Sequence, residues 1–203
     1  MSKLDTNKNG FTVGIYVGSF DPPHNGHLGV ALEILKNNIC NKIFFVPTCY
    51  YWNKEMNSSL DDRKEMLDIV SSSINEECGR SRASNVYLGV HNLYTYEILR
   101  FFRNTYNNLY LIIGADNICK FYEWKNVREI IDNYHIIVVG RDNIDINQYI
   151  KEEDREKFIF VPFDMKISST DIRNDLVRGN DPKGLNPKVL RLITDRGLYG
   201  RNN

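Results

Sequence analysis

Residues Gly14 to Leu28 read GIYVGSFDPPHNGHL. The stretch begins as an apolar strand and ends as the start of a helix expected over 26–37, in which Leu28, Leu32 and Leu35 lie near a 3.6-residue period. The connection between them holds a glycine, a serine, an acid, two prolines and two histidines. Because backbone N–H groups at a helix start attract anions, this turn predicts a binding site for a phosphate chain.

One glycine and two histidines make the turn suited to a phosphate ligand. Gly18 ends the strand and allows backbone to approach a ligand closely. His24 and His27 stand three residues apart around the helix start, so both can face one side and donate hydrogen bonds. The simpler alternative is that both are ordinary helix-start residues.

Two other ligand classes fit the turn less well. A metal site would need a third ligand, and the remaining histidines, His91 and His135, stand at no obvious ligand spacing. Neither a G-x-x-x-x-G-K-[ST] loop nor a G-x-G-x-x-G fingerprint is present in the sequence. The turn is therefore predicted to bind phosphates by a different arrangement.

Strand and helix patterns alternate along the rest of the chain. This alternation predicts an α/β fold with a doubly wound parallel sheet covered on both faces. In such sheets ligands bind outside the carboxyl ends of the strands, which is where the turn lies. The expected strands are 11–17, 42–47, 85–90, 109–114, 135–140 and 157–162, and the further helices are 60–74, 95–106, 125–132, 169–178 and 187–196.

Composition limits the partners and the compartment. The 203-residue chain has 26 basic and 26 acidic residues, which argues against an extended nucleic-acid footprint. No apolar run approaches the roughly 20 residues of a membrane helix, and the polar first ten residues lack a signal-peptide core, so we expect no membrane association. We expect a cytoplasmic protein, with a nuclear or organelle address left open. Free thiols are expected at Cys40, Cys49, Cys78 and Cys119.

A second candidate phosphate site lies near the carboxyl end, where residues 167–173 read ISSTDIR. Ser168 can cap the following helix with Asp171 as its partner three residues on. Ser169 and Thr170 then lie in the first helical turn with free N–H groups, and Arg173 can reach an anion one turn later. An ordinary capped surface helix is the alternative.

The two motifs together resemble the signatures of the nucleotidyltransferase superfamily, with H-x-G-H at 24–27 and its carboxyl-terminal signature at 167–173. Residues 111–141 resemble the nicotinate or nicotinamide mononucleotide adenylyltransferases at Gly114, Asp116, Phe121, Trp124 and Arg141. Residues 94–99 resemble the S-Y-T element of that family, and 185–199 fit its carboxyl end. The resemblance covers roughly residues 12–200 and is closer to the bacterial, nicotinate-preferring branch.

This resemblance implies a Rossmann-like nucleotidyltransferase that acts in NAD biosynthesis. The implied enzyme transfers AMP from ATP, carried with Mg²⁺, to nicotinate mononucleotide, giving nicotinate adenine dinucleotide and pyrophosphate. A dual-specificity or nicotinamide-preferring enzyme and a non-catalytic nucleotide-binding module are the alternatives, and a homodimer is left open. We expect a flexible terminus over 1–10, the nucleotidyltransferase core over 11–164, and a carboxyl-terminal helical subdomain over 165–203.

The resemblance also assigns roles to individual residues. Asp116 is a candidate acceptor for ribose hydroxyls, although a plain turn residue is the alternative, and Trp124 can stack on a pyridine ring, although core packing is the alternative. The catalytic set is His24, His27, Lys54 and Arg173. The ATP-binding set is Gly18, Ser19, Phe20, His24, His27, Gly114, Asp116, Arg141, Ser168, Ser169, Thr170 and Arg173. The mononucleotide-binding set is Ser19, Phe20, Lys54, Thr95 and Trp124.

One segment departs from the family pattern. The bacterial branch has P-P-H-K after the second strand, whereas residues 50–54 read YYWNK. Lys54 is retained, Asn53 replaces the histidine, and Trp52 adds an aromatic ring. The departure weakens the prediction of a strict nicotinate preference.

Overall fold

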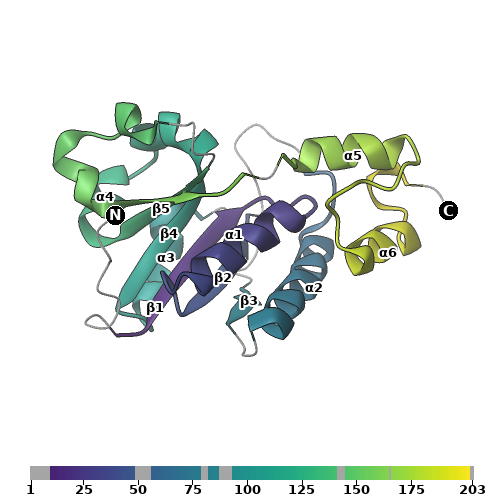
Figure 1. Cartoon of the computed structure of the whole chain (residues 1–203), viewed down its shortest axis with the longest axis horizontal. Coiled ribbons are helices and arrows are strands. Elements are labelled where there is room, and N and C mark those ends of the chain that lie inside the picture. Colours follow the sequence, from purple (N-terminus) through teal and green to yellow (C-terminus); the bar gives the residue numbers. More distant parts are fainter. Residues whose placement is uncertain are drawn as a thin grey trace. The chain divides into compact units, whose positions relative to one another are not determined.

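The strands form one six-stranded parallel sheet in the order β3-β2-β1-β4-β5-β6 (Figure 1). The computed structural model describes residues 10–48, 56–78, 82–86, 93–140, 145–164 and 166–201. Alternating helices connect the strands, so the predicted doubly wound α/β class is confirmed. The strands are β1 (Thr12–Gly18), β2 (Lys42–Pro47), β3 (Ala83–Asn85), β4 (Asn108–Gly114), β5 (His135–Gly140) and β6 (Phe158–Pro162).

Helices occupy most of the expected places. Their bounds are α1 (Asn25–Lys36), α2 (Leu60–Cys78), α3 (Thr95–Arg103), α4 (Val127–Asn133), α5 (Ser169–Val177) and α6 (Pro187–Asp195). Within the described residues, four 3₁₀ segments add to them, namely η1 (Ala115–Glu123), η2 (Ile146–Tyr149), η3 (Glu152–Lys157) and η4 (Leu198–Gly200). Strand β3 begins two residues earlier than predicted, and α2 runs four residues further than predicted. Most of the strand expected at 85–90 lies outside the described residues.

The chain divides into two compact units. The first unit comprises Met1–Val17, Glu33–Phe44 and Leu93–Asp164, and the second comprises Gly18–Leu32, Phe45–Asn92 and Met165–Asn203. The segment predicted as a carboxyl-terminal subdomain thus groups in the second unit with the turn that is predicted to bind phosphates.

Strands β4 and β5 form the centre of the first unit. Leu111, Ile112, Ile136 and Ile137 are completely buried, as expected for strands covered on both faces. Register pairs Thr12 of β1 with Asn108 of β4, and the β1–β4, β4–β5 and β5–β6 pairings are all parallel. These pairings bring the carboxyl ends of β1 and β4 to one edge of the sheet.

Helix α2 packs its apolar stripe, Met66, Leu67, Val70 and Ile74, into the core of the second unit. Helix α6 begins with Asn186 as N-cap and Pro187 at its first position, an arrangement that favours helix initiation. The Asn186 side chain also donates to the Ser73 hydroxyl of α2 at 3.1 Å. This hydrogen bond joins α2 to the start of α6.

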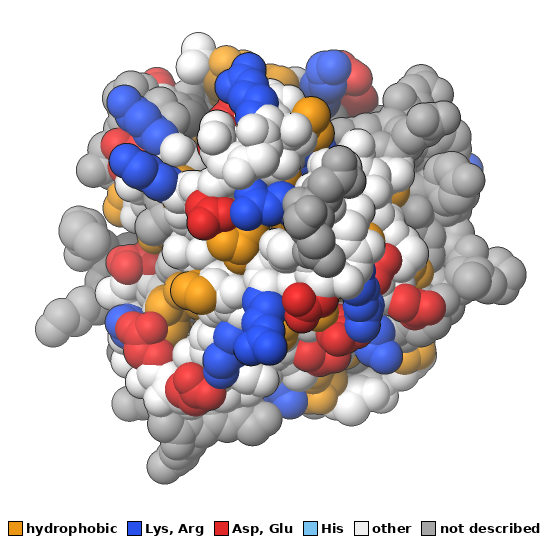
Figure 2. Space-filling view, turned by 90° about the vertical axis from the view of Figure 1, so that its right-hand side faces the viewer, with side chains coloured by type: hydrophobic (Ala, Val, Ile, Leu, Met, Phe, Trp, Pro, Cys, Tyr) orange, Lys and Arg blue, Asp and Glu red, His pale blue; other side chains and the backbone are white. Residues whose placement is uncertain are grey.

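The surface carries mixed charge. Figure 2 shows one face on which Lys and Arg side chains are interspersed with Asp and Glu. Within the described ranges, none of the helices combines the length and apolar character of a membrane span. Cys40, Cys78 and Cys119 are free thiols, and Cys49 lies outside the described residues.

Candidate active site

The phosphate turn, defined as Gly18–His27, connects β1 to α1 within the second unit. Phe20 takes a positive φ of 48°, which is uncommon for a non-glycine residue. Its buried ring contacts Phe45 edge-on at 5.6 Å and His27 at 4.9 Å between centroids. A side chain at Gly18 would press on the Phe20 ring, since its Cβ would lie 3.0 Å from Cζ. The glycine therefore leaves room for the Phe20 ring, whose packing against Phe45 and His27 holds the turn in place.

The two predicted histidines lie together. Their rings stack with centroids 3.8 Å apart. Nδ1 of His24 accepts from the Gly26 backbone N–H at 3.1 Å, and Nδ1 of His27 accepts from the His24 backbone N–H at 3.1 Å. A Cβ at Gly26 would lie 2.8 Å from the His24 ring, which explains the glycine of the H-x-G-H motif. The hydrogen-bond pattern assigns the ring proton of both neutral imidazoles to Nε2.

Burial keeps both imidazoles neutral near pH 7. It lowers the pKa of His24 to about 4. Burial, with a smaller contribution from the charge of His24, also holds the pKa of His27 well below its usual value. Each ring therefore offers an Nε2–H donor without carrying a fixed positive charge. Such donors can hold phosphate oxygens through charge-assisted hydrogen bonds.

Helix α5 contributes its first turn to the same site. The Ser169 hydroxyl donates to the Pro22 carbonyl at 3.0 Å. Arg173 donates from Nη1 to the Asp21 carbonyl at 2.7 Å and from Nη2 to the Thr170 hydroxyl at 3.1 Å. The structure thus brings the two motifs of the sequence together inside one compact unit.

The predicted cap of α5 is confirmed. Ser168 is the N-cap, and its hydroxyl oxygen accepts from the Asp171 backbone N–H at 3.1 Å. The same hydroxyl donates to the Asp171 carboxylate at 2.7 Å. The capped helix start holds Ser169 and Thr170 beside the phosphate turn.

Arg63 of α2 is a residue that sequence reasoning missed. It is 1% exposed, and its Nη1 donates to the carbonyl oxygens of Ser19 and Thr48, both at 2.7 Å. A usable signal was present, because Arg63 occupies the same helical stripe as Met66, Leu67 and Val70. A buried cation therefore fixes the backbone at the beginning of the phosphate turn.

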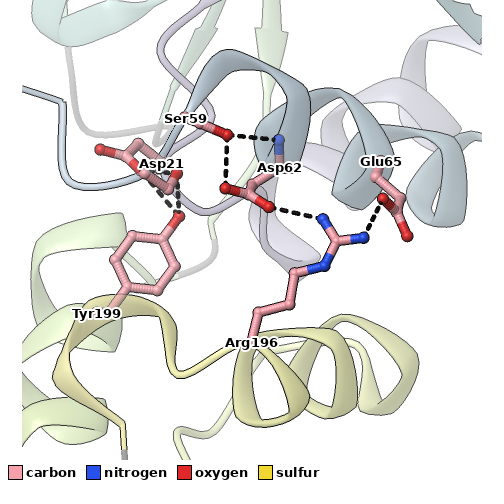
Figure 3. A network of polar contacts seen from close by, with 7 residues as sticks. Asp21, Ser59, Asp62, Glu65, Arg196 and Tyr199 are labelled. Carbon is pink, nitrogen blue, oxygen red and sulfur yellow. Dashed lines mark hydrogen bonds and ion pairs between the residues drawn. The ribbon is translucent and has the colours of Figure 1, made fainter.

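A second missed group is the buried Asp21 and its partners. The structure places Asp21 at 2% exposure and Tyr199 at 7%, with the phenol hydroxyl donating to the carboxylate at 2.8 Å (Figure 3). The two residues lie far apart in sequence, so periodicity and motif spacing carry no sign of the contact.

The first unit holds the residues predicted for ribose and pyridine. Gly114 ends β4, and the exposed Asp116 follows in η1, where its charge, after burial, helps to raise the pKa of Tyr16. Trp124 is half-buried beside Phe121, with ring centroids 5.2 Å apart. These positions follow the carboxyl end of a central strand, as a ligand site in this fold requires.

Thr95 is the first residue of α3 and half-buried. The preceding Tyr94 is the N-cap, and its backbone N–H donates to the Glu97 carboxylate at 2.8 Å. The predicted residues Lys54 and Arg141, and the departing segment 50–54, lie outside the described residues.

This arrangement of a β1–α1 turn with two neutral histidines and a capped helix that offers Ser, Thr and Arg defines the nucleotidyltransferase class. A family model described as Cytidylyltransferase-like matches residues 15–175. The matched stretch contains both phosphate motifs and the central strands.

Curated relatives narrow the class. The chain is 31% identical over 195 residues to a probable nicotinate-nucleotide adenylyltransferase of Clostridium tetani, covering 91% of this chain and 97% of the relative. It is 30% identical over 196 residues to a protein of the same name from Shouchella clausii, covering 94% and 98%. The chain belongs to the nicotinate-nucleotide adenylyltransferase family, a family of nucleotidyltransferase enzymes.

Solved structures share the fold. Plasmodium falciparum nicotinic acid mononucleotide adenylyltransferase complexed with NaAD superposes with a TM-score of 0.78 at 23% identity, covering 95% of this chain and 98% of that one. The same enzyme complexed with APC gives a TM-score of 0.77 at 22% identity. The likeness extends over nearly the full length of both chains.

Proposed function

We propose that the protein catalyses transfer of AMP from ATP to nicotinate mononucleotide, yielding nicotinate adenine dinucleotide and pyrophosphate in NAD biosynthesis. The observation that carries the proposal is the union of the H-x-G-H turn with the first turn of α5 in one compact unit. The relatives' names and the NaAD-bound neighbour support the choice of mononucleotide.

The reaction balances without a strong general base. An oxygen of the mononucleotide phosphate, already ionised at pH 7, attacks the α-phosphorus of ATP. The bond from that phosphorus to the oxygen of the leaving pyrophosphate breaks, and the electron pair leaves with pyrophosphate. Catalysis then consists of positioning and stabilisation of developing charge.

The described residues divide this work. Nε2–H groups of His24 and His27 hold the phosphates, with His27 assigned to the α-phosphate under attack. Arg173 and the hydroxyls of Ser169 and Thr170 bind the β- and γ-phosphates, where the guanidinium offsets the charge that accumulates on pyrophosphate. Lys54 is proposed to do the same.

The donor set also fits Mg²⁺ carried with ATP. The imidazole Nε2–H groups and the guanidinium are hydrogen-bond donors, whereas Mg²⁺ requires oxygen ligands. Phosphate oxygens would therefore hold the ion, and its contribution is to neutralise their charge.

In the first unit, Asp116 is proposed to accept from ribose hydroxyls, and Gly114 and Arg141 are proposed to contribute to the ATP site. Trp124 and Thr95 are proposed to contact the pyridine. Phe20 is buried, so we expect its backbone, with that of Ser19, to face the ligand. Because segment 50–54 departs from the family pattern, an enzyme that accepts both the nicotinate and the nicotinamide mononucleotide is the alternative. Cytoplasmic localisation, the domain boundaries and a homodimer stay predictions.

The first test is pyrophosphate release from ATP and Mg²⁺ with nicotinate mononucleotide or its nicotinamide form. We expect a strong preference for the nicotinate form. Equal rates would establish dual specificity, and no release with either substrate would contradict the proposed reaction and favour a binding module.

A second test separates the donor role of His27 from its role in the turn. In His27→Asn, the amide oxygen can still accept from the His24 backbone N–H, but the Nε2–H donor is lost. We expect kcat to fall more than about tenfold with the fold retained, as for removal of one transition-state donor. His135→Asn in β5 is the matched control, and turnover of His27→Asn near that of the control would refute the role.

A further inference from the structure

The Asp21 carboxylate is buried in the second unit and receives donors from two other segments. It accepts from the Asn57 backbone N–H at 2.7 Å, the Ser58 hydroxyl at 2.6 Å and the Tyr199 hydroxyl at 2.8 Å. Ser58 and Tyr199 are also 2.8 Å apart, so the three oxygens form a closed triangle. Figure 3 shows the Tyr199 ring pointing from the carboxyl-terminal turn toward Asp21. A buried charge with this many donors holds a defined position.

Tyr199 reaches this position from a strained turn. Its φ is 57°, in the left-handed region that bulky residues rarely adopt, and the flanking Gly197 and Gly200 also have positive φ. The buried ring points its hydroxyl at Asp21, and burial, followed by the charge of Asp21, raises the pKa of the phenol. The hydroxyl is thus a neutral donor at physiological pH.

The backbone of residues 21–25 is held by a second set of hydrogen bonds. Arg173 donates to the Asp21 carbonyl and Ser169 to the Pro22 carbonyl. The Asn25 backbone N–H donates to the Gly184 carbonyl at 2.8 Å. Residues 21–25 are therefore fixed through side chain and main chain together, all by partners within the second unit.

This fixed segment sets the direction of the histidines. Both Nδ1 atoms accept from backbone N–H groups of the turn itself, at His24 and Gly26. The path of the backbone therefore determines where the Nε2–H donors point. A shift of Asp21 would turn both donors away from the phosphates that they hold.

We propose that Tyr199 is a positioning residue for ATP: its hydroxyl, through the Asp21 carboxylate, holds the phosphate turn in the conformation that aims His24 and His27. The role rests on the proposed function. The ligand affected is the nucleoside triphosphate, whose phosphates the two histidines are proposed to hold. Of the residues proposed for the mononucleotide, Thr95 and Trp124 belong to the first unit. Ser19 and Phe20 are held separately, by Arg63 on the Ser19 carbonyl and by the ring of Phe45.

The competing explanation is that Tyr199 only fastens the end of the chain. Arg196, three residues earlier, offers the matched control. It anchors the same end of α6 through ion pairs of 2.6 Å to Asp62 and 2.6 Å to Glu65, yet it does not contact Asp21 in the described structure (Figure 3). Tyr134, a residue of the first unit that is 3% exposed, controls for the loss of a phenol hydroxyl from a buried tyrosine.

The experiment compares Tyr199→Phe with Arg196→Gln and Tyr134→Phe in steady-state pyrophosphate release. For Tyr199→Phe we expect kcat/KM for ATP to fall about tenfold, because small misplacement of phosphate donors is costly. The KM for nicotinate mononucleotide at saturating ATP should stay within about twofold of wild type. Both controls should keep kcat/KM for ATP within about twofold.

Two results would overturn the proposal. One is a folded Tyr199→Phe protein with wild-type kcat/KM for ATP, and the other is an equal loss in either control. If Tyr199→Phe does not fold, Ser58→Ala removes the other hydroxyl on the same carboxylate oxygen and must show the same split between the two substrates.

A binding measurement separates this proposal from the proposed function. If wild-type protein releases no pyrophosphate, the assigned reaction fails. Calorimetric binding of Mg·ATP to wild type and Tyr199→Phe then tests the positioning role alone. Weaker binding by about tenfold in the variant supports it, and equal binding refutes it.

Discussion

Two polar clusters tie the carboxyl-terminal turn to the region around the start of α2, and they differ in burial. The Asp21 cluster, formed by Asp21, Asn57, Ser58 and Tyr199, centres on a carboxylate that is 2% exposed. The Arg196 cluster, formed by Arg196, Asp62 and Glu65, has an arginine side chain that is 42% exposed. Both clusters hold several short contacts, but the carboxylate at the centre of the first is buried, whereas water reaches the guanidinium of the second. Burial, rather than the number of hydrogen bonds, should therefore decide how much each cluster contributes to the stability of the fold.

Removal of the Asp21 carboxylate should have the largest effect. Asp21→Ala removes the acceptor of the buried Tyr199 hydroxyl and of the partly buried Asn57 N–H and Ser58 hydroxyl, and each buried group left unsatisfied costs about 1–3 kcal/mol. We expect the free energy of unfolding to fall by roughly 3 kcal/mol or more in urea denaturation. A loss below about 1 kcal/mol would show that water replaces the carboxylate and would remove the contrast between the clusters.

The second largest effect is expected from acid, because lowering the pH protonates buried groups of the phosphate turn and so reduces the stability of the fold. The folded pKa of His24 is about 4, below its usual 6.5. The unfolded chain therefore binds the proton first, and stability falls as pH drops from about 6.5 toward 4, by up to about 3 kcal/mol for this group.

Urea midpoints measured at several pH values would check this slope. His24→Gln should flatten it, and His27, whose pKa is also lowered, should supply most of the remainder. The Asp21 carboxylate acts further toward acid. Burial opposes its ionisation, but the bonds from Ser58, Asn57 and Tyr199 prevail and lower its pKa, so its contribution is lost only as pH falls through that lowered value. An unchanged slope in His24→Gln would contradict the assignment.

The smallest effect is expected in the exposed cluster. Arg196→Gln should lower the free energy of unfolding only slightly, because exposed ion pairs gain little in water. The loss should shrink further in about 1 M salt, where the Debye length is near 3 Å. Urea unfolding at low and high salt measures both effects, and a salt-independent loss as large as that of Asp21→Ala would place this cluster on a par with the buried one.

Local patterns sufficed for much of the fold. The apolar run at 135–140 predicted β5 to the residue, because a strand buried on both faces needs no other signal. The start of β3 at Ala83 was not predicted, because it depends on Asn75 of α2, whose side chain binds the Ala83 backbone through both its amide group and its carbonyl oxygen. Segment η1 was missed, since a 3₁₀ run lacks the 3.6-residue period of an α-helix.

The residues of the candidate site also fall into those that local sequence patterns predicted and those that they did not. His24, His27 and the cap of α5 were predictable because their partners lie within three residues. Tyr199 and Asp21 are 178 residues apart, so only the folded chain reveals their contact. Arg63 gave a partial signal by its place on an apolar stripe, but its carbonyl partners could not be named from the sequence.

The hydrogen bonds inside the phosphate turn also bear on which metal ions its histidines could bind. Zinc and nickel bind neutral imidazole through a nitrogen lone pair, and two histidines on one face of a helix start commonly serve them. Here the Nδ1 lone pairs of His24 and His27 already accept backbone N–H groups, and the Nε2 atoms carry protons. Chelation at either nitrogen would cost these hydrogen bonds or an imidazole proton. In this hydrogen-bonded form the two rings present no lone pair to a transition metal, and in the proposed reaction Mg²⁺ would be carried on the triphosphate.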